Sequence, residues 1–218
     1  MDIKTLAADA REASEKLATT SVETRNAALA SIARALDAER AAIIAANQED
    51  LEAAKQAGLA APLLKRLKFD SAKVDDCIGG LDSLRGLPDP VGIVQRHTEL
   101  SPGLDLTRVT CPIGVVGIIF ESRPDALVQI SSLCLKSGNS CLLKGGSEAL
   151  KTNRRLYETI RVAAASAGIP DGWIQLLETR DDVNGMLALD ESIDLLIPRG
   201  SNAFVRYIMD HTRIPVMG

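Results

Sequence analysis

Apolar residues in the first 90 positions recur at the spacing of helices. Ile3, Leu6, Ala7 and Ala10 follow the i, i+3, i+4, i+7 pattern, which places their side chains on one face of a helix. Three later segments also carry apolar residues at helical spacing: 32–36, 43–51 and 74–81. We therefore expect amphipathic helices throughout this part of the chain.

Turn and capping residues divide this helical part. The run 20–23 (Thr-Ser-Val-Glu) has the form of a capping box at a helix start, and Gly58 can close a helix at its carboxyl end. Residues 86–90 contain two prolines, which lack the amide donor that a helix interior needs. We place a boundary near residue 90.

Residues 91–110 are rich in Val, Ile, Thr and Leu around the turn-forming triplet Ser101, Pro102 and Gly103. This pattern predicts a β-hairpin. A lone two-stranded hairpin is marginally stable in water, so these strands are expected to lie against another chain or another part of the protein. The pattern therefore indicates an oligomer.

From residue 112 onward, short apolar segments alternate with helical ones. The predicted strands are 115–120, 140–143, 174–177 and 195–197. This alternation is typical of βαβ units and predicts an α/β fold with a Rossmann-like parallel sheet flanked by helices. The last residues, 214–218, have the character of a further strand, which suggests a fragment of a longer chain. We divide the sequence into helices (1–90), a hairpin (91–111) and an α/β core (112–218).

The composition excludes several classes of protein. Hydrophobic residues make up 46% and charged residues 25%, as in folded proteins rather than disordered ones. A net charge of −4 with 3% aromatics argues against nucleic acid as a partner. The charged N-terminus is unlike a signal peptide, and the longest apolar run, 113–120, is far shorter than the roughly 20 residues of a membrane span. We expect a soluble, cytoplasmic protein.

The cysteines and histidines offer no metal site and no nucleophile. Cys77, Cys111, Cys134 and Cys141 are far apart, and only two histidines, His97 and His211, occur, so zinc-ligand spacing is absent. A catalytic thiol needs partial exposure and a nearby cation or base. We expect all four thiols to be reduced and buried for structural reasons.

Charged loops follow three of the predicted strands. Arg123 lies in the loop 120–125, where it either binds a phosphate or carboxylate or pairs with a neighbouring acid on the surface. The second loop, 143–148, contains Lys144, two glycines and Ser147, a predicted helix cap. It is alternatively a tight turn with a solvated lysine. The third loop, 197–202, repeats this design with Arg199, Gly200 and Ser201, a predicted helix cap.

The carboxyl ends of parallel strands meet at one edge of a sheet, where ligands collect. Three such loops together predict a site for a phosphate-bearing ligand, a nucleotide cofactor above all. Neither the GxGxxG fingerprint after a strand nor the P-loop motif is present.

The run 112–120 followed by Glu-Ser-Arg-Pro at 121–124 resembles the start of the cofactor-binding core of the aldehyde dehydrogenase superfamily. It is similar in particular to the glutamate-5-semialdehyde dehydrogenase branch, also called gamma-glutamyl phosphate reductase. The resemblance continues through 143–148, 167–170 and 197–201, and it covers essentially the whole chain.

The resemblance implies NADPH-dependent reduction of L-glutamyl 5-phosphate to L-glutamate 5-semialdehyde, a step of proline biosynthesis, by a homo-oligomer. The substrate-binding residues that it implies are Glu121, Ser122 and Arg123. The NADP(H)-binding residues that it implies are Phe120, Lys144, Gly145, Gly146, Ser147, Glu148, Pro198, Arg199, Gly200 and Ser201. In this family the catalytic cysteine would fall beyond Gly218, so the isolated chain is expected to be inactive.

Two other interpretations remain open at this point. The chain is alternatively a non-catalytic nucleotide- or phosphate-binding module. A purely structural role through the exposed hairpin would leave the three charged loops without a purpose.

Overall fold

The structure is a computed structural model that describes residues 2–218, apart from the side chain of Arg180. The first part of the chain is helical, as its apolar pattern predicts. The helices are α1 (Ile3–Ala18), α2 (Val22–Ala38), α3 (Arg40–Gln56), α4 (Ala61–Leu67) and α5 (Ser71–Gly86). Among the described residues, no helix combines the length and the apolar character needed to cross a membrane.

The ends of these helices test the predicted caps. Gly58 follows α3 with a φ of 73° and donates its N–H to the Lys55 carbonyl at 3.0 Å, so this predicted cap is confirmed. The capping box at 20–23 is wrong, because α2 begins one residue later than the box requires. Ser21 is the cap, and its side chain accepts the Thr24 N–H.

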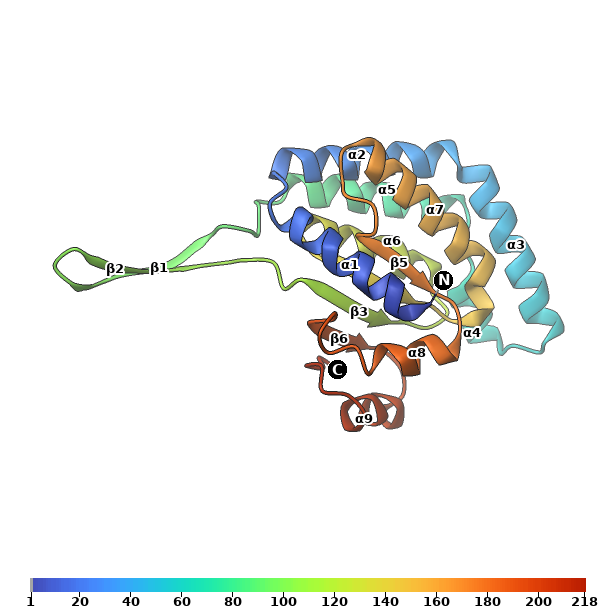
Figure 1. Cartoon of the computed structure of the whole chain (residues 1–218). Coiled ribbons are helices and arrows are strands. Elements are labelled where there is room, and N and C mark those ends of the chain that lie inside the picture. Colours follow the sequence, from blue (N-terminus) through green and yellow to red (C-terminus); the bar gives the residue numbers. More distant parts are fainter. Residues whose placement is uncertain (1) are drawn as a thin grey trace.

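The predicted hairpin is present and stands away from the body of the molecule (Figure 1). Strand β1 (Val94–Ser101) pairs antiparallel with β2 (Leu104–Val109). Every residue of β2 is exposed. Cys111 follows β2 and is also exposed, so the expectation that all four thiols are buried is wrong: the base of the hairpin lies outside the core.

The rest of the chain alternates strands and helices, and the predicted α/β fold with a parallel sheet is confirmed. Its elements are β3 (Val115–Ile119), α6 (Pro124–Lys136), β4 (Ser140–Lys144), α7 (Leu150–Ser166), β5 (Ile174–Leu177), α8 (Arg180–Met186), β6 (Leu195–Pro198) and α9 (Asn202–Asp210). The strands are parallel, in the order β5-β4-β3-β6. Beyond β6, Val216 of the tail forms a parallel bridge with Leu196.

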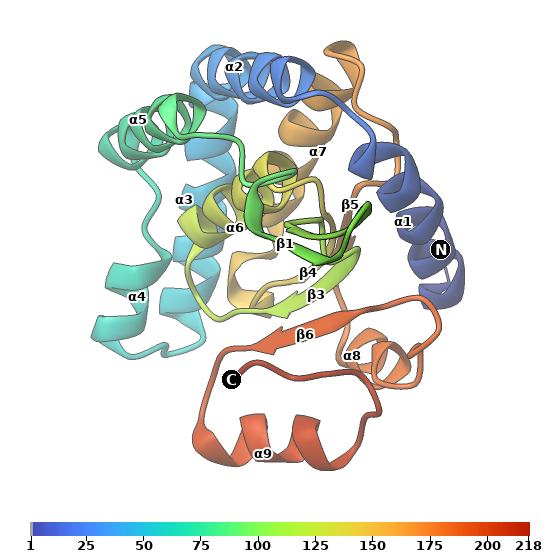
Figure 2. The same cartoon turned by 90° about the vertical axis from the view of Figure 1, so that its left-hand side faces the viewer.

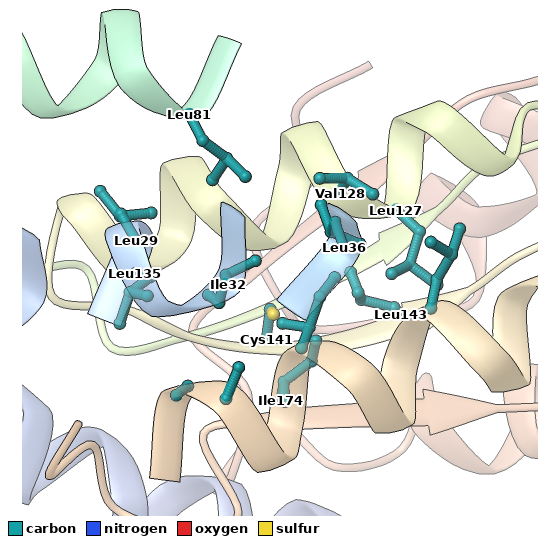
Figure 3. Close-up of a cluster of buried hydrophobic side chains, with 14 of the residues drawn as sticks. Leu29, Ile32, Leu36, Leu81, Leu127, Val128, Leu135, Cys141, Leu143 and Ile174 are labelled. Atoms are coloured by element: carbon teal, nitrogen blue, oxygen red, sulfur yellow. The ribbon is translucent and has the colours of Figure 1, made fainter. Parts of the chain in front are cut away.

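Helices cover both faces of the sheet (Figure 2). Helices α6 and α7 lie on one face, with α2, α3 and α5 packed outside them, and α1 and α8 lie on the other. The strands alternate accordingly: Val116 and Ile118 of β3 join one apolar cluster, whereas Val115 and Ile119 join another. Figure 3 shows the first cluster, in which Leu29 and Ile32 of α2 lie among side chains of α6, β4 and β5. The N-terminal helices therefore share a core with the sheet.

A carboxylate from α3 caps the start of α7. The two oxygens of Asp50 accept the backbone N–H groups of Lys151 and Thr152, at 3.2 and 2.8 Å, and the Thr152 hydroxyl also donates to Asp50. Sequence analysis assigned this cap to Ser147, which instead begins a short 3-10 turn, η1 (Ser147–Ala149). The predicted Ser147 cap is wrong, because an acid distant in sequence already satisfies these amides.

Two buried cations fix the base of the hairpin. Arg25, whose side chain is 3% exposed, donates to the carbonyl of Lys136 and to Asp89 Oδ2, the latter at 2.8 Å. The Lys136 ammonium donates to Asn26 Oδ1 at 2.8 Å and to the Leu87 carbonyl at 2.9 Å, and burial lowers its pKa.

The same cluster holds Asp89 in its charged form. Burial opposes ionisation of this carboxyl, but hydrogen bonds from the Val91 N–H and from Arg25, together with the charge of Lys136, outweigh burial and lower the pKa of Asp89. The ionised carboxylate thus links α2, α6 and the segment that leads into β1.

We expect Asp50→Ala to lower the free energy of unfolding by about 2–3 kcal/mol, because it leaves helix amides and a buried hydroxyl without an acceptor. Glu49 provides a matched control, since its carboxylate is 60% exposed and pairs only with Lys151 among the described contacts. Glu49→Ala should cost less than about 1 kcal/mol. Urea unfolding of both variants measures the difference, and equal losses would contradict the assigned cap.

Asp89 should make stability depend on acid pH. Its folded pKa is lowered, so its contribution is complete above the ordinary carboxyl value of about 4 and is lost as the pH falls further. We expect Asp89→Asn to cost about 1–3 kcal/mol at pH 7 and to cost progressively less below pH 4. Urea unfolding at several pH values measures this, with the exposed Asp82→Asn as the control. A loss that stays constant across this range would refute the prediction.

Candidate functional site

The register of the sheet brings four strand ends to one edge. Ile119, the last residue of β3, lies opposite Lys144 of β4 and Pro198 of β6. Lys144 in turn lies opposite Leu177, the last residue of β5. The segments that follow these strands therefore start side by side, where ligands collect in parallel sheets.

These segments line a cleft of about 710 Å³, a size typical of small-molecule sites. The predicted site residues that line it are Phe120, Glu121, Ser122, Lys144, Gly145, Gly146, Ser147, Glu148 and Arg199. The structure thus brings together most of the residues that sequence analysis proposed from three separate loops.

The lining also includes residues that sequence analysis missed: Leu59, Leu63, Ile119, Glu178, Val183, Asn184, Phe204 and Tyr207. Glu178 directly follows β5, so the strand-end argument extends to it. Val183 lies on α8 and Phe204 on α9, and sequence analysis named neither residue. Leu59 lies just before α4 and Leu63 lies within it, and no signal in the sequence pointed to either residue.

The loop after β4 is tightly packed. The Lys144 side chain is largely buried and its ammonium donates to the Gly145 carbonyl at 2.5 Å. A Cβ atom on Gly145 would lie 2.3 Å from Asn153 Nδ2 and 3.1 Å from the Phe120 ring, so a larger residue does not fit there. At both glycines of this loop, a Cβ atom would force neighbouring side chains to shift. The close packing of the loop therefore depends on the absence of side chains at these two positions.

Two of the acidic side chains that line the cleft, Glu148 and Glu178, are held by specific donors. The Ser122 hydroxyl donates to Glu148 Oε1. Arg154 donates through two nitrogens to the two oxygens of Glu178, and these hydrogen bonds lower the pKa of Glu178. Glu178 is therefore charge-compensated by a residue outside the cleft.

Arg123 does not line the cleft. Its guanidinium lies 3.0 Å from Asp125 Oδ2, and its side chain is 56% exposed. This is the surface pairing that sequence analysis left open as the alternative, and Lys73 approaches the same carboxylate at 3.7 Å. The role of Arg123 toward a substrate stays a prediction.

The loop after β6 divides its predicted residues between two hollows. Arg199 lines the cleft. Its backbone N–H donates to the Ile119 carbonyl at 2.8 Å, which extends the pairing of β6 with β3 by one residue. Pro198 and Gly200 line an adjoining hollow of about 410 Å³ beside α9 that Arg199 shares. Ser201 caps α9 by accepting the Phe204 N–H at 3.2 Å, as sequence analysis expected of this residue.

None of the four cysteines lines the cleft. Burial raises the pKa of the Cys77 thiol to about 12 and also raises the pKa of Cys141, so neither is an activated thiolate. Within residues 2–218, no group of three or more His, Cys, Asp and Glu side chains is placed to hold a metal ion.

The donor set of the cleft suits a nucleotide. Lys144 and Arg199 supply cations for phosphates, and the glycine loop admits close approach of a ligand to the backbone. Apolar side chains from α4, α8 and α9 offer surface for a base or ring. At many phosphate sites the free amides at the start of a helix bind the anion. Here the first amides of α7 already donate to Asp50.

Comparisons with known proteins agree with this geometry. The family model for the aldehyde dehydrogenase family matches residues 1–215. Over all 218 residues the chain is 62% identical to a gamma-glutamyl phosphate reductase of Acetivibrio thermocellus, of which it covers 51%. It is 48% identical over 222 aligned residues to the protein of that name from Methanosarcina mazei, of which it covers 50%.

Solved structures of the same name are also similar. The gamma-glutamyl phosphate reductase of Thermotoga maritima superposes with a TM-score of 0.95 at 36% identity, covering 99% of this chain and 53% of that one. The one from Saccharomyces cerevisiae gives 0.93 at 44% identity, covering 100% and 56%. The chain thus spans about half the length of the curated relatives it matches. With a matching family model along almost its whole length, the chain belongs to the aldehyde dehydrogenase family.

Proposed function

We propose that this chain is the cofactor-binding part of a gamma-glutamyl phosphate reductase that converts L-glutamyl 5-phosphate to L-glutamate 5-semialdehyde with NADPH in the cytoplasm. The observation that carries the proposal is the convergence of loops from β3, β4, β5 and β6 on one cleft with two cations. The relatives of that name support it, since they match the chain from end to end.

The cofactor site of this proposal lies in the cleft. Lys144 and Arg199 would bind its phosphates, and the Gly145–Gly146 backbone would lie against it, with Phe120, Ser147 and Glu148 around it. Pro198, Gly200 and Ser201 would border its pyrophosphate from the adjoining loop. The nicotinamide would supply the hydride, and the residues of this chain would bind and orient the cofactor.

The substrate would be held by the loop after β3. Glu121 and Ser122 line the cleft, and Arg123 follows them at the start of α6. An exposed guanidinium beside the cleft is suited to the phosphate or the carboxylate of L-glutamyl 5-phosphate. Binding there would require Arg123 to exchange its contact with Asp125 for the substrate.

The hairpin would bind a second copy of the chain. Its strands expose Val94, Leu100, Leu104, Leu106 and Val109, each to more than half of its surface. Apolar side chains on an otherwise unsupported hairpin are expected to be covered in the working protein. The proposal therefore includes a homo-oligomer.

We expect the purified chain to bind NADPH saturably and more tightly than NADH. Lys144→Ala should weaken NADPH binding by roughly tenfold or more, because it removes a charged hydrogen-bond donor from the phosphate site. Lys16→Ala is the control, since Lys16 is exposed on α1 and pairs with Glu12. Titration followed by nicotinamide fluorescence measures both. Absence of NADPH binding by the unsubstituted chain would contradict the cofactor assignment.

In a protein extended to the full length of the relatives, Arg123→Ala should raise the substrate KM by about tenfold or more, through loss of a charged contact. The Kd for NADPH should change little. Arg85→Ala serves as the control, because Arg85 also forms an exposed ion pair with an acid of its own helix. Steady-state kinetics and nucleotide titration separate the two effects, and an unchanged substrate KM would rule out this role.

A further inference from the structure

One buried carboxylate faces two cations next to the predicted substrate loop. Asp125, in the first turn of α6, has a side chain that is only 7% exposed. Its Oδ2 atom lies 3.0 Å from a guanidinium nitrogen of Arg123 and 3.7 Å from the ammonium of Lys73. Lys73 belongs to α5, which packs against α6. The two cations therefore reach the same oxygen atom from different elements.

Both cations are much more exposed than the acid that they share. The side chain of Arg123 is 56% exposed and that of Lys73 is 42% exposed. Removing the partner of a buried carboxylate costs far more free energy than removing the partner of an exposed one, even where a helix start favours its negative charge. Among the described residues, Arg123 and Lys73 are the cations within 4 Å of Asp125, so these two side chains share its compensation.

The proposed function requires Arg123 to leave this pair. Arg123 follows Ser122, which lines the cleft, and its guanidinium donates to Asp125. If the guanidinium turned to an anionic substrate with no substitute in place, the buried Asp125 charge would lose its partner, and that cost would oppose substrate binding. A shift of about 1 Å would bring the Lys73 ammonium to hydrogen-bonding distance of the same oxygen.

We propose that Lys73 is a positioning residue for the substrate: it takes over the Asp125 carboxylate when Arg123 turns to the phosphate or the carboxylate of L-glutamyl 5-phosphate. This inference rests on the proposed function, because it concerns the same substrate loop. It assigns to Lys73 an effect on substrate affinity that is exerted through Asp125 and needs no contact between Lys73 and the substrate.

Steady-state kinetics of a protein extended to the full length of the relatives test the effect on the substrate. Lys73→Met removes the charge and keeps an apolar side chain, so it should raise the substrate KM by about fivefold and change kcat by less than about twofold. The Kd for NADPH should not change. Lys73→Arg keeps the charge and should hold the KM within about twofold of the original value. In the Asp125→Asn background, where no charge needs a partner, Lys73→Met should change the KM by less than about twofold.

Asp76→Asn is the matched control. Asp76 Oδ2 lies 3.8 Å from the same Lys73 ammonium, but the Asp76 side chain is 72% exposed. Loss of this exposed charge should leave the substrate KM within about twofold of the original value. A rise as large as that of Lys73→Met would show that Lys73 acts through Asp76 instead of Asp125, and would refute the proposal.

Thermal unfolding of this chain, followed by circular dichroism, tests the exchange of partners without a substrate. Arg123→Ala alone should lower the Tm by less than about 2 °C, because Lys73 still compensates for Asp125. In the Lys73→Met background the same substitution should lower the Tm by about 5 °C or more. If the double variant does not fold, adding Asp125→Asn should restore a cooperative transition, because this change removes the buried charge.

Three results would overturn the proposal while leaving the proposed function intact. The first is an unchanged substrate KM in folded Lys73→Met. The second is an equal rise of the KM in the presence and absence of the Asp125 charge, which would indicate that Lys73 contacts the substrate directly. The third is a pair of additive Tm losses in the double variant. An extended protein without reductase activity on L-glutamyl 5-phosphate would contradict the proposed function itself, and this inference would fail with it.

Discussion

The parallel register of the sheet is the constraint on which the site depends. Because Ile119, Lys144, Leu177 and Pro198 lie at one level across four strands, the segments that follow them leave the sheet together. Parallel strands with helical crossovers force this arrangement, since each helix must return the chain to the opposite edge. The cleft is therefore a product of topology, and the identities of Lys144, Ser122 and Arg199 add its chemistry.

Contacts from the N-terminal helices complete this framework. Asp50 of α3 satisfies the first amides of α7. Asn47 of the same helix bonds to the Leu67 carbonyl and to the Phe69 N–H, at 2.9 and 2.7 Å, and so secures the end of α4. Because α4 contributes Leu63 to the cleft, one buried polar group beneath it helps to fix a wall of the binding site. The helical region and the sheet act as one packed unit.

Several charged and polar groups at the cleft already have partners within the protein. Glu178 is neutralised by Arg154, Glu148 is held by Ser122, and the α7 amides are already bonded. The cleft is also lined by two cations, Lys144 of β4 and Arg199 of the loop after β6, by a further acid, Glu121, and by a glycine backbone and apolar side chains. This combination favours an anionic ligand with an aromatic or heterocyclic part, in keeping with a dinucleotide.

The sequence by itself determined the helical first part, the hairpin, the alternation of strands and helices and the strand-end loops, because these follow from local periodicity, prolines and glycines. It also supplied Lys144 and Arg199 as binding candidates, since charges directly after buried strands face a shared edge. Only the tertiary structure decided that Asp50 rather than Ser147 caps α7, that Arg123 pairs with Asp125, and that Leu59 and Leu63 border the cleft. The Asp50 cap and the cleft positions of Leu59 and Leu63 depend on residues distant in sequence, which the packing of α3 against α4, η1 and α7 brings together. The Arg123–Asp125 pair is local, and the structure decides only between the two alternatives that the sequence left open.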